Sequence, residues 1–246
     1  MRFDILTLFP DFFKGPLSSS LLGKAIEKKI VEIYLHDIRE CGVGKHKQVD
    51  DRPFGGGPGM VLKPDVLKQS LEKVTRSAKK KEAKKPHVVL LDPAGQPFNQ
   101  QKAKDLAKKQ WLILICGHYE GVDERFKELF VDSEVSIGDY ILSGGETAAL
   151  VVTETISRLV PGFLGKQESV ISESFSKVKL GGKEVALLDY PAFTRPENFL
   201  NRRVPKVLLS GNHQQIEKWR LEKAIEKTRK RRPDLLREQI TVSRKR

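Results

Sequence analysis

The sequence predicts an α/β fold in which a parallel sheet carries helices on both faces and is followed by a small helical C-terminal domain. Short apolar runs such as residues 111–117, "WLILICG", alternate with amphipathic stretches through the first two-thirds of the 246 residues. These runs are almost continuously apolar, which is typical of parallel strands buried on both faces. Beyond Pro161 the periodicity is lost, and it returns in one long basic stretch near the end.

The elements of the first part follow in a regular order. Short apolar runs predict strands at residues 2–9, 31–36, 87–92, 111–117 and 132–142. Apolar residues at helical spacing predict helices at residues 19–29, 63–74, 99–109, 122–130 and 146–160. Ser143 and Glu146 have capping-box spacing at the start of the last helix, and Pro161-Gly162 is expected to end it.

Three segments are expected along the chain. Residues 1–162 form the α/β domain. Residues 163–191, rich in Ser, Gly and Lys, are expected to be a linker that is mobile unless a partner orders it. Residues 192–246 form the small, basic, helical domain, with a long amphipathic helix at 213–232 and a short one at 233–240.

Positive charge is concentrated at the end of the chain. Lys and Arg number 45 and Asp and Glu 32, a formal net charge of +13. Residues 202–246 alone hold 15 basic and 5 acidic residues, a surplus of ten positive charges. Such a surplus is typical of a protein that binds a polyanion, and nucleic acid is the polyanion that we expect. The alternative is a solvated helix surface with a basic tail.

Composition also narrows the class of protein. Hydrophobic residues make up 39% of the chain, which fits a globular protein rather than a disordered one. No apolar run is long enough to cross a bilayer, and the first residues lack a signal-peptide cleavage site, so a cytoplasmic location without membrane contact is expected. Cys41 and Cys116 lie in unlike surroundings, and a disulfide framework is not expected.

Three turns, each directly after a predicted strand, contain residues that let a backbone approach a ligand closely. They are "LDPAGQPF", "CGHYEGVDE" and "IGDYILSGGE", at residues 91–98, 116–124 and 137–146. Ligands of open parallel sheets bind at the carboxyl ends of strands, so the turns are expected to form one pocket. The G-x-G-x-x-G fingerprint and the P-loop lysine are absent, so backbone contacts to an adenine or ribose fit better than a triphosphate. Taken alone, the last turn could also be only a capped strand-to-helix connection.

These turns belong to a longer series of motifs. In order along the chain stand "DDRPFGGGPGM", "LDPAGQ", "CGHYEGVDER", "IGDYILSGGE", "RLVPGFLG", "ESF", "YPAFTRP" and "LLSGNHQQIEKWR". Together they closely resemble the bacterial tRNA (guanine-N1)-methyltransferases of the SPOUT superfamily, from about Met1 to about Leu236. The resemblance implies S-adenosylmethionine as cofactor, a trefoil-knotted cofactor site, and a homodimer with its active site at the subunit interface. It further implies that the substrate is tRNA and that the target is guanine 37, just 3′ of the anticodon.

The resemblance also implies residue roles. A general base and a cation near O6 are needed to remove the N1 proton of guanine, and the matching positions are Glu173 and Arg158. Glu173 stands where the family has Asp, and Ala148 where many members have Pro. The implied cofactor-binding residues are Leu91, Pro93, Gly95, Gly117, Tyr119, Glu120, Gly121, Ile137, Gly138, Asp139, Tyr140, Ile141, Leu142, Gly144 and Gly145. The implied substrate-binding residues are Asp51, Arg52, Ser174, Asn212, His213 and Arg220. Mg²⁺ is a further cofactor that the family suggests, and no metal site can be located in the sequence.

Two alternatives stay open at this point. One is another knotted RNA methyltransferase, which acts on a ribose hydroxyl or on ribosomal RNA. The other is a non-catalytic RNA-binding protein that keeps the fold as a scaffold. Loss of the pocket glycines, of Arg158 or of the linker carboxylate would favour the scaffold, and all of them are present.

Overall fold

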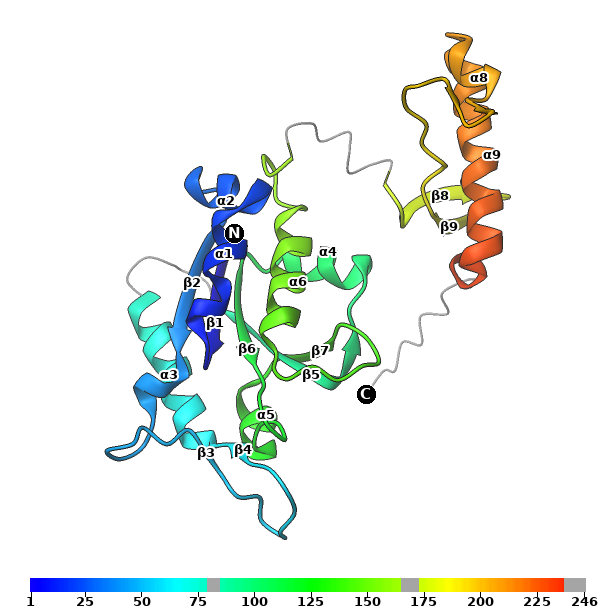
Figure 1. The fold of residues 1–246 in the computed structure, drawn as a ribbon. Coiled ribbons are helices and arrows are strands. Elements are labelled where there is room, and N and C mark those ends of the chain that lie inside the picture. Colours follow the sequence, from blue (N-terminus) through cyan, green and yellow to red (C-terminus); the bar gives the residue numbers. More distant parts are fainter. Residues whose placement is uncertain (79–84, 165–172, 237–246) are drawn as a thin grey trace. The chain divides into compact units, whose positions relative to one another are not determined.

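The computed structural model describes residues 1–78, 85–164 and 173–236. The chain divides into two compact units, Met1–Gly165 and Lys166–Arg246, and each is described by itself. The first unit contains a five-stranded parallel sheet with helices on both faces (Figure 1), so the predicted α/β class and parallel sheet are confirmed.

The sheet of the first unit has the strand order β2-β1-β6-β5-β7, and every neighbouring pair is parallel. All six residues of the central strand β6 are buried, which explains its uninterrupted apolar sequence. The strands are β1 (Arg2–Thr7), β2 (Glu32–Asp37), β5 (His87–Pro97), β6 (Trp111–Cys116) and β7 (Ser133–Ser136). The helices are α1 (Lys14–Ser18), α2 (Ser20–Glu27), α3 (Pro64–Ala78), α4 (Gln100–Ala107), α5 (Glu124–Phe130) and α6 (Glu146–Ser157), with 3₁₀ helices η1 (Pro10–Phe13) and η2 (Ile38–Cys41).

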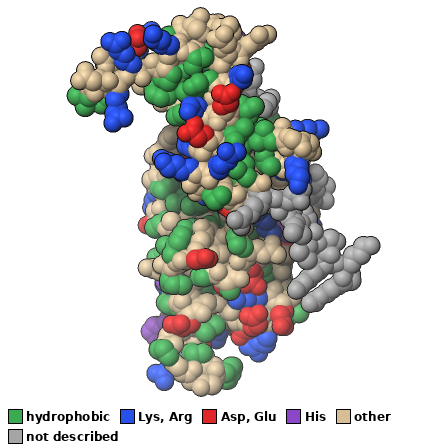
Figure 2. Space-filling view, turned by 90° about the vertical axis from the view of Figure 1, so that its right-hand side faces the viewer, with side chains coloured by type: hydrophobic (Ala, Val, Ile, Leu, Met, Phe, Trp, Pro, Cys, Tyr) green, Lys and Arg blue, Asp and Glu red, His purple; other side chains and the backbone are tan. Residues whose placement is uncertain are grey.

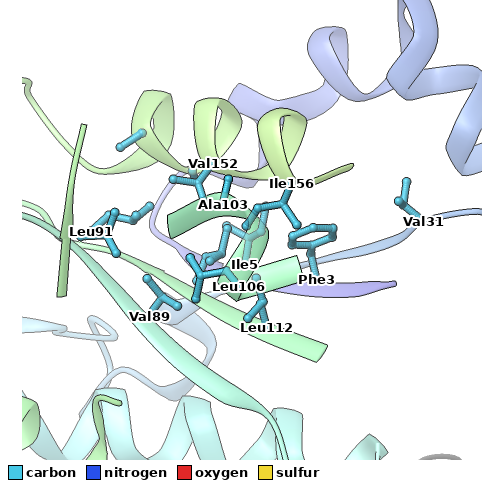
Figure 3. Packing of buried hydrophobic residues seen from close by; sticks show 14 of the residues in the cluster. Phe3, Ile5, Val31, Val89, Leu91, Ala103, Leu106, Leu112, Val152 and Ile156 are labelled. Atoms are coloured by element: carbon cyan, nitrogen blue, oxygen red, sulfur yellow. The ribbon is translucent and has the colours of Figure 1, made fainter. Parts of the chain in front are cut away.

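Successive side chains of the strands point to opposite faces of the sheet and pack into two separate apolar cores. Phe3 and Ile5 of β1 pack with Val152 and Ile156 of α6 on the face that α2, α4 and α6 cover (Figure 3). The intervening Leu6 points to the opposite face and packs with residues of α3 and α5. Burial on both faces fixes the register of each strand, so the carboxyl ends of the strands are held at one edge of the sheet.

The structure corrects two expectations for the first unit. The strand expected at 132–142 ends at Ser136, and residues 137–145 form an irregular turn, whereas β5 runs on to Pro97 with an irregularity between Leu91 and Gln96. The predicted capping box is wrong. Gly145, not Ser143, is the N-cap of α6, and no side chain caps the helix. Glu146 points inward instead, because its buried carboxylate accepts a 2.7 Å hydrogen bond from Thr7 Oγ1 at the end of β1.

The second unit combines hairpins with one long helix. Residues 176–187 of the expected linker, 163–191, form an antiparallel hairpin, an element that was not predicted from the sequence. Its Val185 and Leu187 pack with Ala224 of the long helix, and this contact holds the hairpin in place. The elements are β8 (Ser176–Leu180), β9 (Lys183–Leu187), β10 (Asn198–Phe199), β11 (Arg202–Arg203), α8 (Lys206–Leu209), α9 (His213–Arg231) and the 3₁₀ helix η3 (Pro233–Leu236). Of the short helix expected at 233–240, residues 237–240 lie outside the described residues.

Candidate functional site

The three predicted turns meet at the carboxyl edge of the sheet and enclose one cavity of about 370 Å³. The first lies in the irregular second half of β5, and the other two follow β6 and β7; these strands are neighbours or next neighbours in the sheet. The cavity falls within the range of roughly 300–1000 Å³ that small-molecule pockets occupy. Its lining residues are Leu91, Asp92, Pro93, Ala94, Gly117, His118, Tyr119, Glu120, Gly121, Val135, Ser136, Ile137, Gly138, Tyr140, Ile141, Leu142, Ser143, Gly144, Gly145 and Ala148.

The glycine pair before α6 is needed for a close approach of two backbone segments. Gly145 N–H donates a 2.8 Å hydrogen bond to the carbonyl of Gly117, and Gly144 forms an antiparallel bridge with His118. A Cβ on Gly145 would lie 2.8 Å from Cys116 Cα, closer than side chains approach a backbone. The turn therefore lies directly against the end of β6, and its backbone lines the cavity.

The wall formed by β5 is held by an ionic cluster. Asp92 accepts a 2.8 Å hydrogen bond from the backbone N–H of Ala94, which fixes the irregular part of β5. Lys127 of α5 contacts Asp92 at 3.2 Å, and Glu124 and Glu134 at 3.5 Å each. Burial by itself would lower the pKa of Lys127, but the three carboxylates outweigh it and raise that pKa. Lys127 is thus held charged and links α5 to β5 and β7.

A glycine-rich loop, residues 52–60, is attached to the turn after β6. It connects β3 (Asp50–Asp51) to β4 (Val61–Leu62). Glu120 N–H donates to the carbonyl of Met60, and Leu62 N–H donates to that of Gly121, both at 3.0 Å. The side chain of Glu120 lies against Gly59, where a Cβ would collide with it. Residues of this loop are therefore held beside the mouth of the cavity.

Thirteen of the fifteen implied cofactor-binding residues line this cavity. The two exceptions are Gly95 and Asp139. A Cβ on Gly95 would clash with the backbone of Val135, so that glycine allows β5 to pass close to β7. The seven further lining residues, Asp92, Ala94, His118, Val135, Ser136, Ser143 and Ala148, are not among those that the resemblance implies. For Ala148 the available signal was its place in the first turn of the helix that follows the glycine pair. The cofactor roles themselves stay predictions.

The two implied catalytic residues belong to different units. Arg158 follows α6 directly as its C-cap and belongs to the first unit. Glu173 is half-buried in the second unit, where its carbonyl accepts a 3.1 Å hydrogen bond from Ser176 N–H at the start of the β8–β9 hairpin. The hairpin thus fixes the backbone of Glu173 from its C-terminal side.

Several implied substrate-binding residues have structural partners. Ser174 Oγ accepts from Asp189 N–H at 3.0 Å, and Asn212 caps α9 by accepting from Gln215 N–H at 3.1 Å. The Arg220 guanidinium donates to Glu217 at 2.7 Å and lies 4.8 Å above the Tyr190 ring. Ser174, Asn212 and Arg220 therefore each have a structural role within the second unit that does not involve RNA.

The other implied substrate-binding residues are exposed. In the first unit Asp51 accepts from the backbone N–H of Arg52 at 2.8 Å, and Arg52 begins the glycine-rich loop. In the second unit His213 is the exposed first residue of α9. On the face of the second unit in the upper part of Figure 2, Lys and Arg side chains lie among hydrophobic ones.

A second cavity, of about 650 Å³, is larger but differs in position. It lies at the opposite, amino-terminal edge of the sheet, where Arg2, Glu32 and Trp111 begin their strands. None of the three glycine-containing turns reaches it, and ligands of open parallel sheets bind at the other edge. The smaller cavity is therefore the candidate ligand site.

Within residues 1–78, 85–164 and 173–236, no group of three or more His, Cys, Asp and Glu side chains could hold a metal ion. In the same residues no helix is both long and apolar enough to span a bilayer.

The fold and the pocket define an α/β protein with a cavity of small-molecule size at the carboxyl edge of a parallel sheet and with a basic second unit. The chain belongs to the tRNA (guanine-1)-methyltransferase family, because the model of that family, tRNA (guanine-1)-methyltransferase TrmD, matches residues 1–238. Relatives named tRNA (guanine-N(1)-)-methyltransferase are similar over almost the whole chain. The protein of Brevibacillus brevis is 50% identical over 96% of this chain and 91% of its own. That of Pelotomaculum thermopropionicum is 50% identical over 97% and 90%, and that of Bacillus cereus strain AH820 is 47% identical over 97% and 93%.

Proposed function

We propose that this protein methylates N1 of guanine 37 in tRNA and that S-adenosylmethionine is the methyl donor. Family membership over residues 1–238 and the printed names of the relatives support a tRNA guanine-N1 methyltransferase. The observation that carries the choice of donor is the cavity at the carboxyl edge. Thirteen residues implied by the family resemblance line it together, and its glycine-containing turns leave backbone groups close to a ligand.

The cavity fits an adenosine-type cofactor. Leu91, Ile137 and Leu142 supply apolar walls for a purine, and the backbone of residues 137–145 supplies hydrogen-bonding groups. Gly121 and Gly138 have backbone φ values of +116° and +152°, which residues other than glycine rarely adopt. A site in which the protein backbone contacts the ligand depends on glycines more than on charged side chains.

The proposed chemistry needs one base and one cation from this chain. When bound, S-adenosylmethionine would supply an electrophilic methyl group and leave as the neutral thioether. Glu173 takes the proton from guanine N1 as the N1–methyl bond forms, so a carboxylate becomes a carboxylic acid. Negative charge moves to O6 of the guanine at the same time, and the Arg158 guanidinium stabilises it there. Because these residues belong to different units, the proposed catalysis depends on both units.

A direct test is to incubate an unmodified tRNA transcript with the protein and the methyl donor, and to analyse nuclease digests by mass spectrometry. We expect 1-methylguanosine in the fragment that contains position 37, and none in a transcript with adenosine there. Methylation of a ribose or of another base would favour a different knotted RNA methyltransferase. Binding of tRNA without any methylation would favour the RNA-binding scaffold.

We also infer a homodimer, a trefoil knot in the cofactor site and a cytoplasmic location. The family resemblance supports the first two, and a tRNA substrate supports the third. Light scattering should give twice the mass of 27.8 kDa for the dimer. We propose no site for Mg²⁺, since the described residues offer no cluster of ligands for it.

A further inference from the structure

The second unit contains a narrow hairpin, β10–β11, whose tip projects two apolar side chains. Asn198 pairs with Arg203 and Phe199 with Arg202, and a 2.9 Å hydrogen bond from Val204 N–H to Glu197 carries the pairing one step further. The two turn residues, Leu200 and Asn201, both have positive φ, +49° and +62°. Such a pair is typical of a type I′ turn, which matches the twist of the two strands.

The exposure of the tip is unusual for its composition. Phe199 is 65% exposed and Leu200 80%, and every residue from Asn198 to Arg203 is exposed. The nearby Phe193 differs, because its ring packs against that of Trp219, with the two ring centroids 6.2 Å apart. Among the described residues Phe199 has no such ring partner. A left-handed conformation is also unfavourable for leucine, so the backbone holds Leu200 outward against its own preference.

The charge beside the tip indicates what it binds. Arg202 and Arg203 form no ion pair within the described residues, so their guanidinium groups are available. The described part of the second unit, residues 173–236, holds 15 basic and 8 acidic residues. An aromatic ring beside uncommitted arginines on a basic surface is the combination that binds unpaired nucleotides, with the ring stacking on a base and the arginines holding phosphates.

We propose that the β10–β11 tip binds an unpaired nucleotide of the tRNA. The Phe199 ring stacks on the base, Leu200 packs against the adjacent sugar or base edge, and Arg202 and Arg203 hold the flanking phosphates. This inference rests on the proposed function, because it needs tRNA to bind the second unit. It adds a contact that contributes to binding and takes no part in proton transfer.

The test compares tRNA binding by full-length variants, with fluorescence anisotropy of a labelled transcript as the readout. Phe199→Ala should weaken binding roughly 10- to 100-fold, the range expected for loss of one base–aromatic stack. Phe199→Tyr should bind like the wild type, because it keeps the ring. Phe199→Leu should bind as weakly as Phe199→Ala if stacking is the contact. The matched control is Leu129→Ala, which removes a 73% exposed leucine from the first unit and should change nothing.

Two further measurements separate the possible outcomes. Arg202→Gln and Arg203→Gln should each reduce the slope of log affinity against log salt by about one, as expected for a phosphate contact. Binding to a blunt RNA duplex, which offers no unpaired base, should be equal for Phe199→Ala and the wild type. Cofactor affinity and circular dichroism should be unchanged in every variant, and Phe199→Leu serves if Phe199→Ala does not fold.

Several results would overturn the proposal. If wild-type protein binds tRNA and Phe199→Ala binds it equally well, the tip is not a nucleotide contact, although the proposed function stands. If Phe199→Leu keeps full affinity, the tip is an apolar contact and not a stacking one. If Phe199→Ala instead lowers the mass found by light scattering, the tip belongs to an interface between copies of this chain. If wild-type protein does not bind tRNA at all, the proposed function itself fails.

Discussion

The two units differ in their charge and in the size of their apolar cores. The first, Met1–Gly165, holds 25 basic and 22 acidic residues and is built around two large apolar cores. The second, Lys166–Arg246, holds 20 basic and 10 acidic residues, and the apolar cluster among its described residues has only three buried members. A small cofactor needs a rigid, enclosed pocket, and a large core provides it. A polyanion needs exposed positive charge over a wide area, which a small core can support.

Removal of the second unit is the most severe test of this division. A chain that ends at Gly165 should bind S-adenosylmethionine as the full protein does, because the whole cavity belongs to the first unit. It should lose tRNA binding altogether, because the surplus of ten charges lies beyond the cut. Calorimetry with the cofactor and filter binding with tRNA would measure the two affinities. A truncated chain that still binds tRNA with full affinity would contradict the division.

The position of that cut follows from the structure. A cut near Pro191, which the sequence alone favours, would leave the β8–β9 hairpin without α9. Val185 and Leu187 would then lose their contact with Ala224 and become exposed. Aggregation of such a fragment would say nothing about RNA binding.

The next largest effect is expected at Glu173. Glu173→Gln keeps the size of the side chain but lacks a basic oxygen, so methyl transfer should slow by a factor on the order of 10²–10⁴. Cofactor affinity should stay the same. Arg158→Ala should slow the same step, and the double variant should show less than the sum of both effects in free energy, because both groups act on one transition state. Single-turnover methylation with saturating tRNA is the appropriate measurement.

A matched control for that experiment lies in the hairpin that follows Glu173. Glu184 is an exposed carboxylate that pairs with Lys177 at 3.0 Å, and Glu184→Gln should react like the wild type. If Glu173→Gln also reacts at the wild-type rate, another group accepts the proton, and Asp139 beside the cavity becomes the next candidate. In that case all catalytic residues would belong to the first unit, and the second unit would contribute only to tRNA binding.

A smaller effect, confined to the first unit, is expected at Gly145. Gly145→Val places atoms where the turn lies against β6, so cofactor affinity should fall about tenfold or more, and Gly145→Ala should fall between it and the wild type. The control is Gly15→Val, since a Cβ on Gly15 has no neighbour within 4 Å. Calorimetry should show the loss, and tRNA binding without cofactor should be unchanged. Unchanged cofactor affinity would mean that the glycine serves only the path of the chain.

The parts of the fold that follow from local pattern were predictable, and those that depend on distant contacts were not. The buried strand at Trp111–Cys116 and the helix at Glu146–Ser157 are evident from their apolar spacing. The inward turn of Glu146 was not, because its partner Thr7 lies 139 residues away in sequence. The hairpin at 176–187 did carry a local signal. Gly181 and Gly182, both at positive φ, separate two alternating runs, but the many lysines obscured that alternation.

The candidate site also has features that local sequence pattern predicts and features that depend on distant contacts. The strand-following turns predicted one pocket at the carboxyl edge, because parallel strands bring their carboxyl ends together. The ionic cluster around Lys127 could not be foreseen, since it joins residues of β5, α5 and β7 that only the folded chain brings into contact. The placement of Arg158 and Glu173 in separate units could also not be predicted, because residues 176–187 were expected to belong to a linker and instead form a hairpin of the second unit.

The smallest effect on activity, and one on stability alone, is expected at Asp4 in the sheet of the first unit. Its fully buried carboxylate accepts hydrogen bonds from Arg2 Nε at 2.7 Å and Trp111 Nε1 at 2.8 Å, and contacts His36 Nε2 at 2.7 Å. Burial alone would raise the pKa of Asp4, but the hydrogen bonds of His36, Arg2 and Trp111 together outweigh it and lower that pKa. The carboxylate therefore stabilises the folded unit while it is ionised.

This depressed pKa fixes the direction of the pH effect. The stabilisation is fully present above the pKa of an unfolded aspartate, about 3.9, and is lost as the pH falls through the lower folded value. Asp4→Asn should destabilise the first unit by about 2 kcal/mol at pH 7, as expected for lost hydrogen bonds to a charged group. The difference from the wild type should shrink below about pH 4. Methylation at neutral pH and moderate temperature should be unaffected, because Asp4 lies away from the cavity residues.

The two tryptophans allow this prediction to be measured in one unit at a time. Trp111 belongs to the first unit and Trp219 to the second, so in a Trp219→Phe background the fluorescence reports only the first. Urea unfolding followed by this signal at pH 7 and at pH 3.5 gives the four free energies needed. Asp105→Asn is the control, because the pKa of the exposed Asp105 is lowered chiefly by its hydrogen bond with Lys108, and its loss should leave unfolding unchanged. A gap between wild type and Asp4→Asn that is equal at both pH values would mean that packing, and not the charge of Asp4, stabilises this part of the sheet.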